Sequence, residues 1–427
     1  MRVAIVSYYA PPEPAVASHR VLRLSRTLLA HGHEVHWVTL AAAQLLARDD
    51  TLAAATPAAV VRHELGGPTL ASRPAARNLP EKLLRTLTHK LPGWLALPDK
   101  HVEWAWRLRR ELPALARREG FDAVLLTCGP HGQILAIPAL RRACPRLRIL
   151  VDYRDLLSGN AWTRTGGERV RQRLLQRERA ALRLADQLFV NTSEALREFE
   201  QTFVPPPCPV QLMRNAADYA LADELADELA ARGGRPTPRD GIHLGFFGTI
   251  FPRRRLRPVL DALALLDAAA LRQVTVHVYC DARDSKRLLE EDLPQVPAAV
   301  RERVMRHDPV PFATALQAMR EMTALLLVNG SEPEDAIFVP GKLYDYLMAR
   351  RPVLFVGNPG DAWQIVADTS GPGHCFTYAE TAELAGSIAA LAPRPGDLAP
   401  ARQYDAATSF APLLTCLEAG RDPGAAR

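Results

Sequence analysis

The chain has 427 residues and a mass of 47.0 kDa, which is more than one ordinary hydrophobic core accommodates and indicates two domains, or three. Apolar residues make up 48% and charged residues 23%, which excludes a disordered or fibrous protein. The net charge of +6 is uneven, because residues 1–200 hold 30 Lys and Arg against 19 Asp and Glu, a net charge of +11, and the rest of the chain is acidic.

Local patterns exclude further classes of protein. No window of about 20 residues is free of charged residues and helix breakers, which argues against a membrane-spanning helix. The apolar run at residues 3–6 is too short for the core of a signal peptide, so we expect a cytoplasmic protein. The six cysteines contain no C-x-x-C pair, and neither a disulfide framework nor a zinc site is indicated.

The first half alternates predicted strands and helices. Residues 1–7, with their apolar run at 3–6, have the length and composition of a strand buried on both faces of a parallel sheet. Residues 41–98 are irregular apart from an amphipathic stretch at 79–91. The predicted elements are strands at 1–7, 33–40, 123–127, 147–151 and 187–191, and helices through Val21, Leu24 and Leu28 and at 104–118, 133–142 and 169–185. This order predicts a Rossmann-like domain.

Breakers at 205–209 and 233–238 mark a domain boundary, which we place near residue 220. The alternation then starts again. The predicted elements are strands at 242–248, 274–279, 324–328 and 352–356, and helices at 258–271, 313–322, 342–350 and 404–418. The sequence therefore predicts an α/β protein with two Rossmann-like domains, at residues 1–220 and 221–400.

The loop after the strand at 242–248 has the composition of an anion-binding site. Gly248 permits close backbone approach at the strand end, and Arg253, Arg254 and Arg255 follow it. An exposed charged turn is the alternative interpretation of these arginines. A nicotinamide site is not indicated, because no Gly-x-Gly-x-x-Gly follows the first strand of the chain.

A second anion-binding feature is a predicted helix start. Gly341 and Lys342 open this helix, and Asp345 lies one turn further on. Backbone N–H groups and an ammonium group suit a diphosphate, and a carboxylate nearby suits a ribose. An exposed helical pair of Lys342 and Asp345 is the alternative.

These features resemble the GT-B glycosyltransferases of family 4, whose members are retaining. The resemblance rests on the tandem architecture, the basic loop after Gly248 and the stretch 340–354. Further matches in the first half lie at residues 8–12, 32–35, 98–100 and 151–155. The resemblance covers nearly the whole chain. It implies a GT-B fold, in which the two domains face each other across a cleft and a C-terminal helix at about 401–420 returns to the N-terminal domain.

The resemblance also implies donor-binding residues. The family binds the donor diphosphate with an Arg and a Lys, for which Arg253 or its neighbours and Lys342 match. Asp345 matches the second carboxylate of the Glu-x7-Glu motif. The first position falls on Ile337, which cannot accept a hydrogen bond, so the N–H groups of Gly341 and Lys342, or Glu334 and Asp335, are candidates to replace it.

For the N-terminal domain, the resemblance implies a phosphate or acceptor loop and a histidine at the sugar. Small residues between Ala15 and Ser18 stand where the family has a Gly-rich loop, and we assign Ala15, Ser18, Arg20 and Arg154 to this region. His131 is the best match to the family histidine, and Asp155 follows the neighbouring strand. The alternatives are a His131 without a catalytic role and an Asp155 that caps a helix or pairs with Arg154.

The sequence thus predicts a retaining glycosyltransferase that moves a sugar from a nucleotide diphosphate sugar to a hydroxyl or amine acceptor, without a metal or other cofactor. The acceptor is expected to be a glycolipid, a polysaccharide or a secondary metabolite. A nucleotide-sugar epimerase and a nucleic-acid-binding protein that uses the basic half are the alternatives, the latter without a recognised motif. Residues 79–91 could contact anionic lipid at the membrane surface, or could pack on their own domain.

Overall fold

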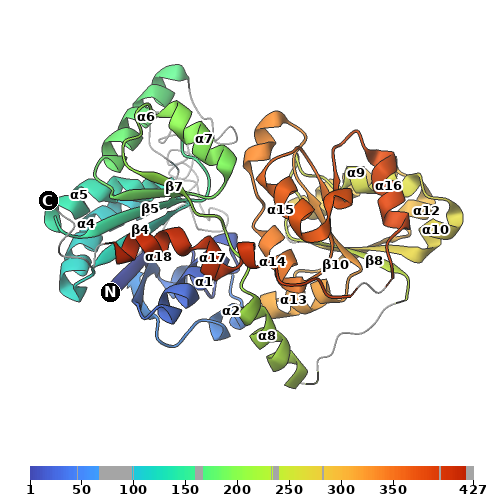
Figure 1. Cartoon of the computed structure of the whole chain (residues 1–427), viewed down its shortest axis with the longest axis horizontal. Helices are drawn as coiled ribbons and strands as arrows, with labels where there is room; N and C mark the ends of the chain where they lie inside the picture. Colours follow the sequence, from blue (N-terminus) through green and yellow to red (C-terminus); the bar gives the residue numbers. More distant parts are fainter. Residues whose placement is uncertain are drawn as a thin grey trace, which may run out of the picture. The chain divides into compact units, whose positions relative to one another are not determined.

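The computed structural model describes residues 1–45, 47–66, 99, 101–158, 167–231, 233, 240–280, 283–393 and 396–419. The chain divides into two compact units (Figure 1). Unit 1 is Met1–Ala216 together with Ala406–Arg427, and unit 2 is Ala217–Asp405. The amphipathic stretch at 79–91 lies outside the described residues.

Unit 1 is built on a parallel seven-stranded sheet in the order β3-β2-β1-β4-β5-β6-β7. Its strands are β1 (Arg2–Val6), β2 (Glu34–Leu40), β3 (Val61–Leu65), β4 (Ala123–Cys128), β5 (Arg148–Tyr153), β6 (Gln187–Val190) and β7 (Val210–Leu212). The central strands β1, β4 and β5 are buried almost throughout, as expected for parallel strands with both faces covered. The strand order reverses between β1 and β4, which is where ligands bind in such sheets.

Helices cover this sheet, and one of them ends at a glycine. They are α1 (Val16–Ala30), α2 (Asp50–Ala54), α4 (Val102–Glu119), α5 (Ile137–Ala143), α6 (Glu168–Leu182) and α7 (Ser193–Thr202). Gly120 ends α4 with φ at 63°, a left-handed conformation that costs glycine little.

The C-terminal residues complete the core of unit 1. The short helices α17 (Ala406–Ser409) and α18 (Ala411–Glu418) lie beside α1. Phe410, Leu413 and Leu417 are fully buried in one cluster with Leu24 and Leu28 of α1. The expected return of a C-terminal helix to the first domain is therefore present, although it forms as two short helices.

Unit 2 is built on a parallel six-stranded sheet in the order β10-β9-β8-β11-β12-β13. Its strands are β8 (Ile242–Phe247), β9 (Val274–Tyr279), β10 (Val304–His307), β11 (Ala324–Val328), β12 (Val353–Val356) and β13 (Cys375–Phe376). Its helices are α8 (Tyr219–Ala231), α9 (Arg257–Ala264), α10 (Ala268–Gln273), α11 (Arg283–Asp292), α12 (Ala298–Arg301), α13 (Phe312–Arg320), α14 (Lys342–Ala349), α15 (Asp361–Ser370) and α16 (Thr381–Ala389). The order of these strands again reverses, here between β8 and β11.

The two faces of this sheet carry different groups of helices. α9 and α16 pack against each other, and their apolar side chains share a core cluster with alternate residues of β8 and β9. α8, α13 and α14 contact one another and form a second group (Figure 1). The expected helix at 258–271 is two helices, because the Asp267 carboxylate accepts hydrogen bonds from the N–H groups of Ala269 and Ala270 and starts α10 anew.

Candidate functional site

The carboxyl end of β8 meets the start of α14. Gly248 follows β8 with φ at 107°, and its N–H donates to the Tyr279 carbonyl at 2.8 Å. A Cβ at Gly248 would stand 3.5 Å from the Lys342 Nζ, and that Nζ lies 3.8 Å from the centre of the Phe246 ring. Lys342 is the first residue of α14, after Gly341 as the N-cap, so an ammonium group and a helix N-terminus stand beside the backbone of Gly248.

The three consecutive arginines after Gly248 point in different directions. Arg254 places its guanidinium carbon 5.2 Å from the centre of the Phe338 ring. Arg253 instead forms an ion pair with Asp335 at 3.3 Å. Arg255 is bound to Asp292 at 2.9 Å and to the Leu288 carbonyl at 2.7 Å, which gives it a structural role.

The loop before α14 is held rigidly. The Asp335 carboxylate is fully buried and accepts from the Glu332 N–H at 3.2 Å. A Cβ at Gly330 would stand 1.9 Å from that carboxylate, so only glycine fits there. Asn329 donates to the carbonyls of Asp335 and Phe338, at 3.0 Å each. These contacts turn Asp335 into the protein, away from the role that we considered for it in place of the absent acceptor at Ile337.

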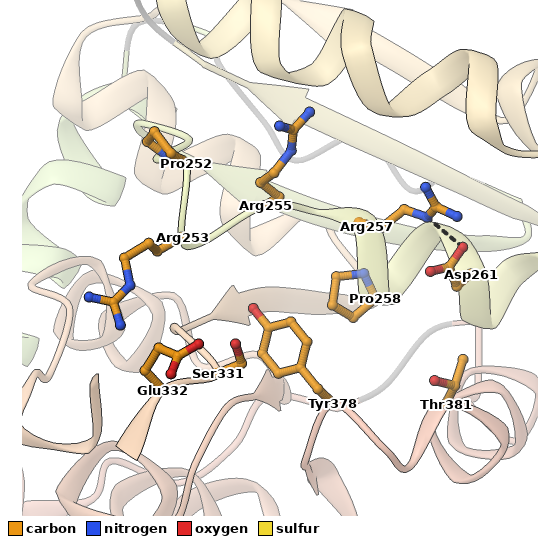
Figure 2. A pocket seen from close by; sticks show the side chains of 10 residues that line it. All are labelled: Pro252, Arg253, Arg255, Arg257, Pro258, Asp261, Ser331, Glu332, Tyr378 and Thr381. Atoms are coloured by element: carbon orange, nitrogen blue, oxygen red, sulfur yellow. Dashed lines mark hydrogen bonds and ion pairs between the residues drawn. The ribbon is translucent and has the colours of Figure 1, made fainter. Parts of the chain in front are cut away.

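A pocket of about 370 Å³ lies beside this loop, at the carboxyl ends of β8, β11 and β13 (Figure 2). Arg253 extends toward Glu332 on one side, and the Arg257–Asp261 ion pair of 2.7 Å lies on the other. Tyr378 projects between them, and its hydroxyl donates to the Asn329 carbonyl at 2.8 Å. Of the predicted donor residues, Arg253 and its neighbour Arg255 line this pocket. Gly248, Arg254, Gly341, Lys342 and Asp345 do not.

In unit 1, His131 and Asp155 come together as expected. They follow the adjacent strands β4 and β5, and the Nε2–H of His131 donates to the Asp155 backbone carbonyl at 2.6 Å. The His131 ring meets the Tyr153 ring edge-on, with the centres 5.4 Å apart. The donor role of Nε2 leaves Nδ1 as the acceptor atom of the neutral ring. Asp155 itself is exposed.

Arg154 and Asp99 hold the loop in which His131 lies. Arg154 donates to the Gly129 carbonyl at 2.7 Å, and a Cβ at Gly129 would collide with its guanidinium at 2.1 Å. Asp99 accepts from the N–H groups of Gly132 at 2.6 Å and of His101 at 2.7 Å. Burial raises the pKa of Asp99, but the hydrogen bonds from His101 and Gly132, together with the His101 charge, outweigh it and hold that pKa below its usual range.

The predicted loop of small residues is only partly available to a ligand. Ser18 is fully buried in α1, and the Ala15 N–H donates to the Glu13 carbonyl at 2.8 Å. Arg20 is 1% exposed and binds Asp152 through two hydrogen bonds of 2.9 and 2.7 Å. The structure therefore does not support a place for Arg20 or Ser18 in an acceptor loop, because burial removes both from solvent.

Sequence reasoning missed two carboxyl groups of unit 1, the buried Glu178 and the half-buried Glu13. Burial raises the pKa of Glu13, in the loop after β1, to about 7, and burial likewise raises the pKa of Glu178 on α6 to about 7. The Ser158 hydroxyl donates to the Glu178 carboxylate. A signal existed for Glu178, which precedes the buried Ala181 and Leu182 by three and four residues and so shares their helix face.

Comparisons with known proteins agree with this architecture. Residues 17–221, just under half of the chain, match the family described as Glycosyltransferase Family 4. No curated protein sequence matches the chain significantly.

Solved structures with a similar fold extend the comparison to the whole chain. Anabaena HepE in complex with UDP-glucose has a TM-score of 0.59 at 14% identity, over 98% of this chain and 100% of that one. The α,α-trehalose-phosphate synthase (UDP-forming) from Burkholderia xenovorans, in complex with glucose-6-phosphate, has a TM-score of 0.63 at 14% identity over the same shares. WaaG, a glycosyltransferase involved in lipopolysaccharide biosynthesis, has a TM-score of 0.53 at 15% identity, over 96% of this chain and 95% of that one. Residues 17–221 thus match a glycosyltransferase family 4 domain, and the chain as a whole has the GT-B fold that these glycosyltransferases share.

Proposed function

We propose that the protein is a retaining, metal-independent glycosyltransferase that moves a sugar from a nucleotide diphosphate sugar to a hydroxyl or amine acceptor. The observation that carries this proposal is the position of Lys342. Its ammonium group stands beside Gly248, at the N-terminus of α14 and at the switch point of the unit 2 sheet. A diphosphate placed there would meet a cation, backbone N–H groups and a glycine without a side chain to obstruct it.

The reaction requires stabilisation of the leaving group more than any other assistance. As the bond between the anomeric carbon and the phosphate oxygen breaks, negative charge grows on the diphosphate. Lys342, Arg254 and the first turn of α14 supply the opposite charge without a metal ion. In a retaining reaction the acceptor oxygen attacks from the face that the diphosphate leaves, and its proton passes to the departing phosphate oxygen. Asp345, one turn into α14, is proposed to bind the ribose.

The donor and acceptor classes follow from similarity and charge. UDP-glucose is the first donor to test, since HepE was solved with UDP-glucose and the trehalose-phosphate synthase forms UDP. The net charge of +11 in residues 1–200 favours an anionic or membrane-associated acceptor, and a cytoplasmic protein that binds the membrane surface is proposed. Within the described ranges, no helix has the length and apolar character to cross a bilayer.

Binding and turnover assays test the site and the stereochemistry separately. UDP-, GDP- and dTDP-sugars are screened by thermal shift, because a bound donor raises the melting temperature. Lys342→Met should weaken donor binding about 10- to 100-fold, the worth of a charge-assisted hydrogen bond. Lys286→Met is the matched control, since Lys286 is exposed and pairs with Asp308. Unchanged binding in Lys342→Met would refute the site, whereas an inverted anomeric configuration in the NMR spectrum of the product would refute retention alone.

A further inference from the structure

Two histidines and a glutamate meet in unit 1, away from the proposed catalytic loops. His36 lies on β2, His63 on β3 and Glu119 at the end of α4. One ligand atom from each of the three lies within 4.8 Å of the other two. The His36 Nδ1 and the His63 Nε2 are 2.9 Å apart, and the two rings are stacked with their centres 5.2 Å apart.

The orientation of His36 is set by a second carboxylate. Its Nε2 lies 3.1 Å from the Glu34 Oε1, so a proton on Nε2 is donated to Glu34 and Nδ1 keeps its lone pair. That lone pair points toward the His63 Nε2. A carboxylate that fixes the tautomer of an imidazole in this way is the usual support of a metal-bound histidine.

The distances suit a small tetrahedral ion after a minor adjustment. With metal–nitrogen bonds of about 2.0 to 2.1 Å, tetrahedral geometry places two nitrogen ligands about 3.3 Å apart. The His36 and His63 nitrogens would therefore separate by only about 0.4 Å from their present 2.9 Å. Glu119 is 27% exposed, which leaves the ion open to solvent and to a water molecule as fourth ligand.

The charges around the cluster permit a cation. Arg118 pairs with Glu119 at 2.8 Å, but it is 68% exposed and can turn into solvent at little cost. Arg2 pairs with the other oxygen of Glu34 at 2.9 Å and donates to the Glu119 backbone carbonyl at 3.0 Å, which leaves the Glu119 carboxylate to the ion. Phe121 meets both imidazole rings edge-on, at 5.0 and 6.0 Å, and covers one side of the pair.

We propose that His36, His63 and Glu119 bind one divalent transition-metal ion, with Zn²⁺ as the ion that this set of imidazole and carboxylate ligands fits. His36 lies in the amino-terminal half of β2, His63 in the middle of β3 and Glu119 at the end of α4, whereas His131 follows the carboxyl end of β4. The ion is therefore a structural one. It ties β3, the edge strand of the sheet, to β2 and to α4.

Metal titration of the full chain tests this proposal independently of transferase activity. The protein is stripped with EDTA and titrated with ZnCl₂ in a calorimeter, and with Co²⁺ in a spectrophotometer to detect tetrahedral coordination. We expect one ion per chain, and a rise in melting temperature of about 5 °C at zinc a hundredfold above the dissociation constant. His63→Gln and Glu119→Gln should each weaken binding at least tenfold.

The matched control is His243→Gln. The His243 Nδ1 lies 2.9 Å from the His277 Nε2 in unit 2, and its other nitrogen contacts the Asp240 backbone carbonyl; among the described residues this pair belongs to no group of three possible metal ligands. Zinc binding should survive in this variant. If His63→Gln fails to fold by circular dichroism, Glu119→Gln carries the test, because Glu119 lies at the surface. Equal zinc affinity in Glu119→Gln and the parent chain, or no binding up to about 1 mM zinc, overturns the proposal.

Discussion

Arg20→Met removes a charge that is buried in unit 1. The guanidinium binds Asp152 at 2.9 and 2.7 Å, and the two side chains are 1% and 0% exposed. It also donates to the carbonyls of Met213 and Arg214, at 3.1 Å each. Breaking a buried pair by removing one partner costs about 3 to 5 kcal/mol, because the remaining carboxylate is uncompensated. We expect a loss of about 4 kcal/mol, which lowers the melting temperature of unit 1 by roughly 8 to 16 °C.

Differential scanning calorimetry measures this loss, and two further variants sharpen it. Arg20→Met/Asp152→Asn removes both charges and should recover about half of the lost stability, since no unpaired charge remains buried. Arg171→Met is the control, because Arg171 pairs with Glu168 on an exposed helix face and its loss should leave the melting temperature unchanged. If Arg20→Met folds with an unchanged melting temperature and binds the acceptor more weakly, the structural role of Arg20 is refuted. Arg20 would then be an acceptor-binding residue, as the sequence predicts.

Three other expectations follow from the structure. The pKa of Glu178 is about 7 in the folded protein and 4.5 in the unfolded chain, so its contribution to folding stability is fully present below pH 4.5 and falls by up to about 3 kcal/mol as the pH rises through 7. The free energy of unfolding, measured with urea between pH 5 and 8, should therefore depend less on pH in Glu178→Gln than in the parent chain. An equal pH dependence in the two proteins contradicts this expectation. Gly248→Ala forces alanine to a φ of 107° and places a methyl group 3.5 Å from the Lys342 Nζ, so the affinity for UDP-glucose, measured by calorimetry, should fall at least tenfold. Gly386→Ala is the control and should leave this affinity unchanged, because a Cβ at Gly386 meets no atom within 4 Å. Leu413→Ala should lower the stability of unit 1 by about 2 to 5 kcal/mol in thermal unfolding, because Leu413 is fully buried in the core. Leu265→Ala is the control, since Leu265 is exposed. An equally large loss in the control would contradict the assignment of α18 to the core of unit 1.

The interior strands could be predicted from sequence, and the edge strands β3, β7, β10 and β13 could not. β1, β4, β8 and β11 are buried on both faces over most of their length, so each appears as a run in which apolar residues predominate. β3, β7 and β10 are short and partly exposed, and their mixed polar and apolar residues give no periodic signal. Their pairing with a neighbouring strand, which composition does not reveal, decides their conformation.

The candidate site could likewise be predicted only in part from sequence. The proximity of Gly248 and Lys342 could be predicted from sequence, because a strand end and a helix start are local features. The directions of Arg253, Arg254 and Arg255 were not, since each is decided by a partner distant in sequence, namely Asp335, Phe338 and Asp292. The histidine and glutamate cluster was likewise hidden, because its ligands come from three separate elements and carry no spacing motif.

The position of residues 406–419 has a consequence for biosynthesis. Unit 1 is encoded in two pieces, with the whole of unit 2, residues 217–405, between them. While the ribosome is still making unit 2, the α1 side of the first sheet lacks Phe410, Leu413 and Leu417, and it exposes the apolar surface that they later cover. At about 5 to 20 residues per second, this interval lasts roughly 10 to 40 s. During it the nascent chain is a substrate for chaperones, and unit 2 can finish folding before unit 1 does.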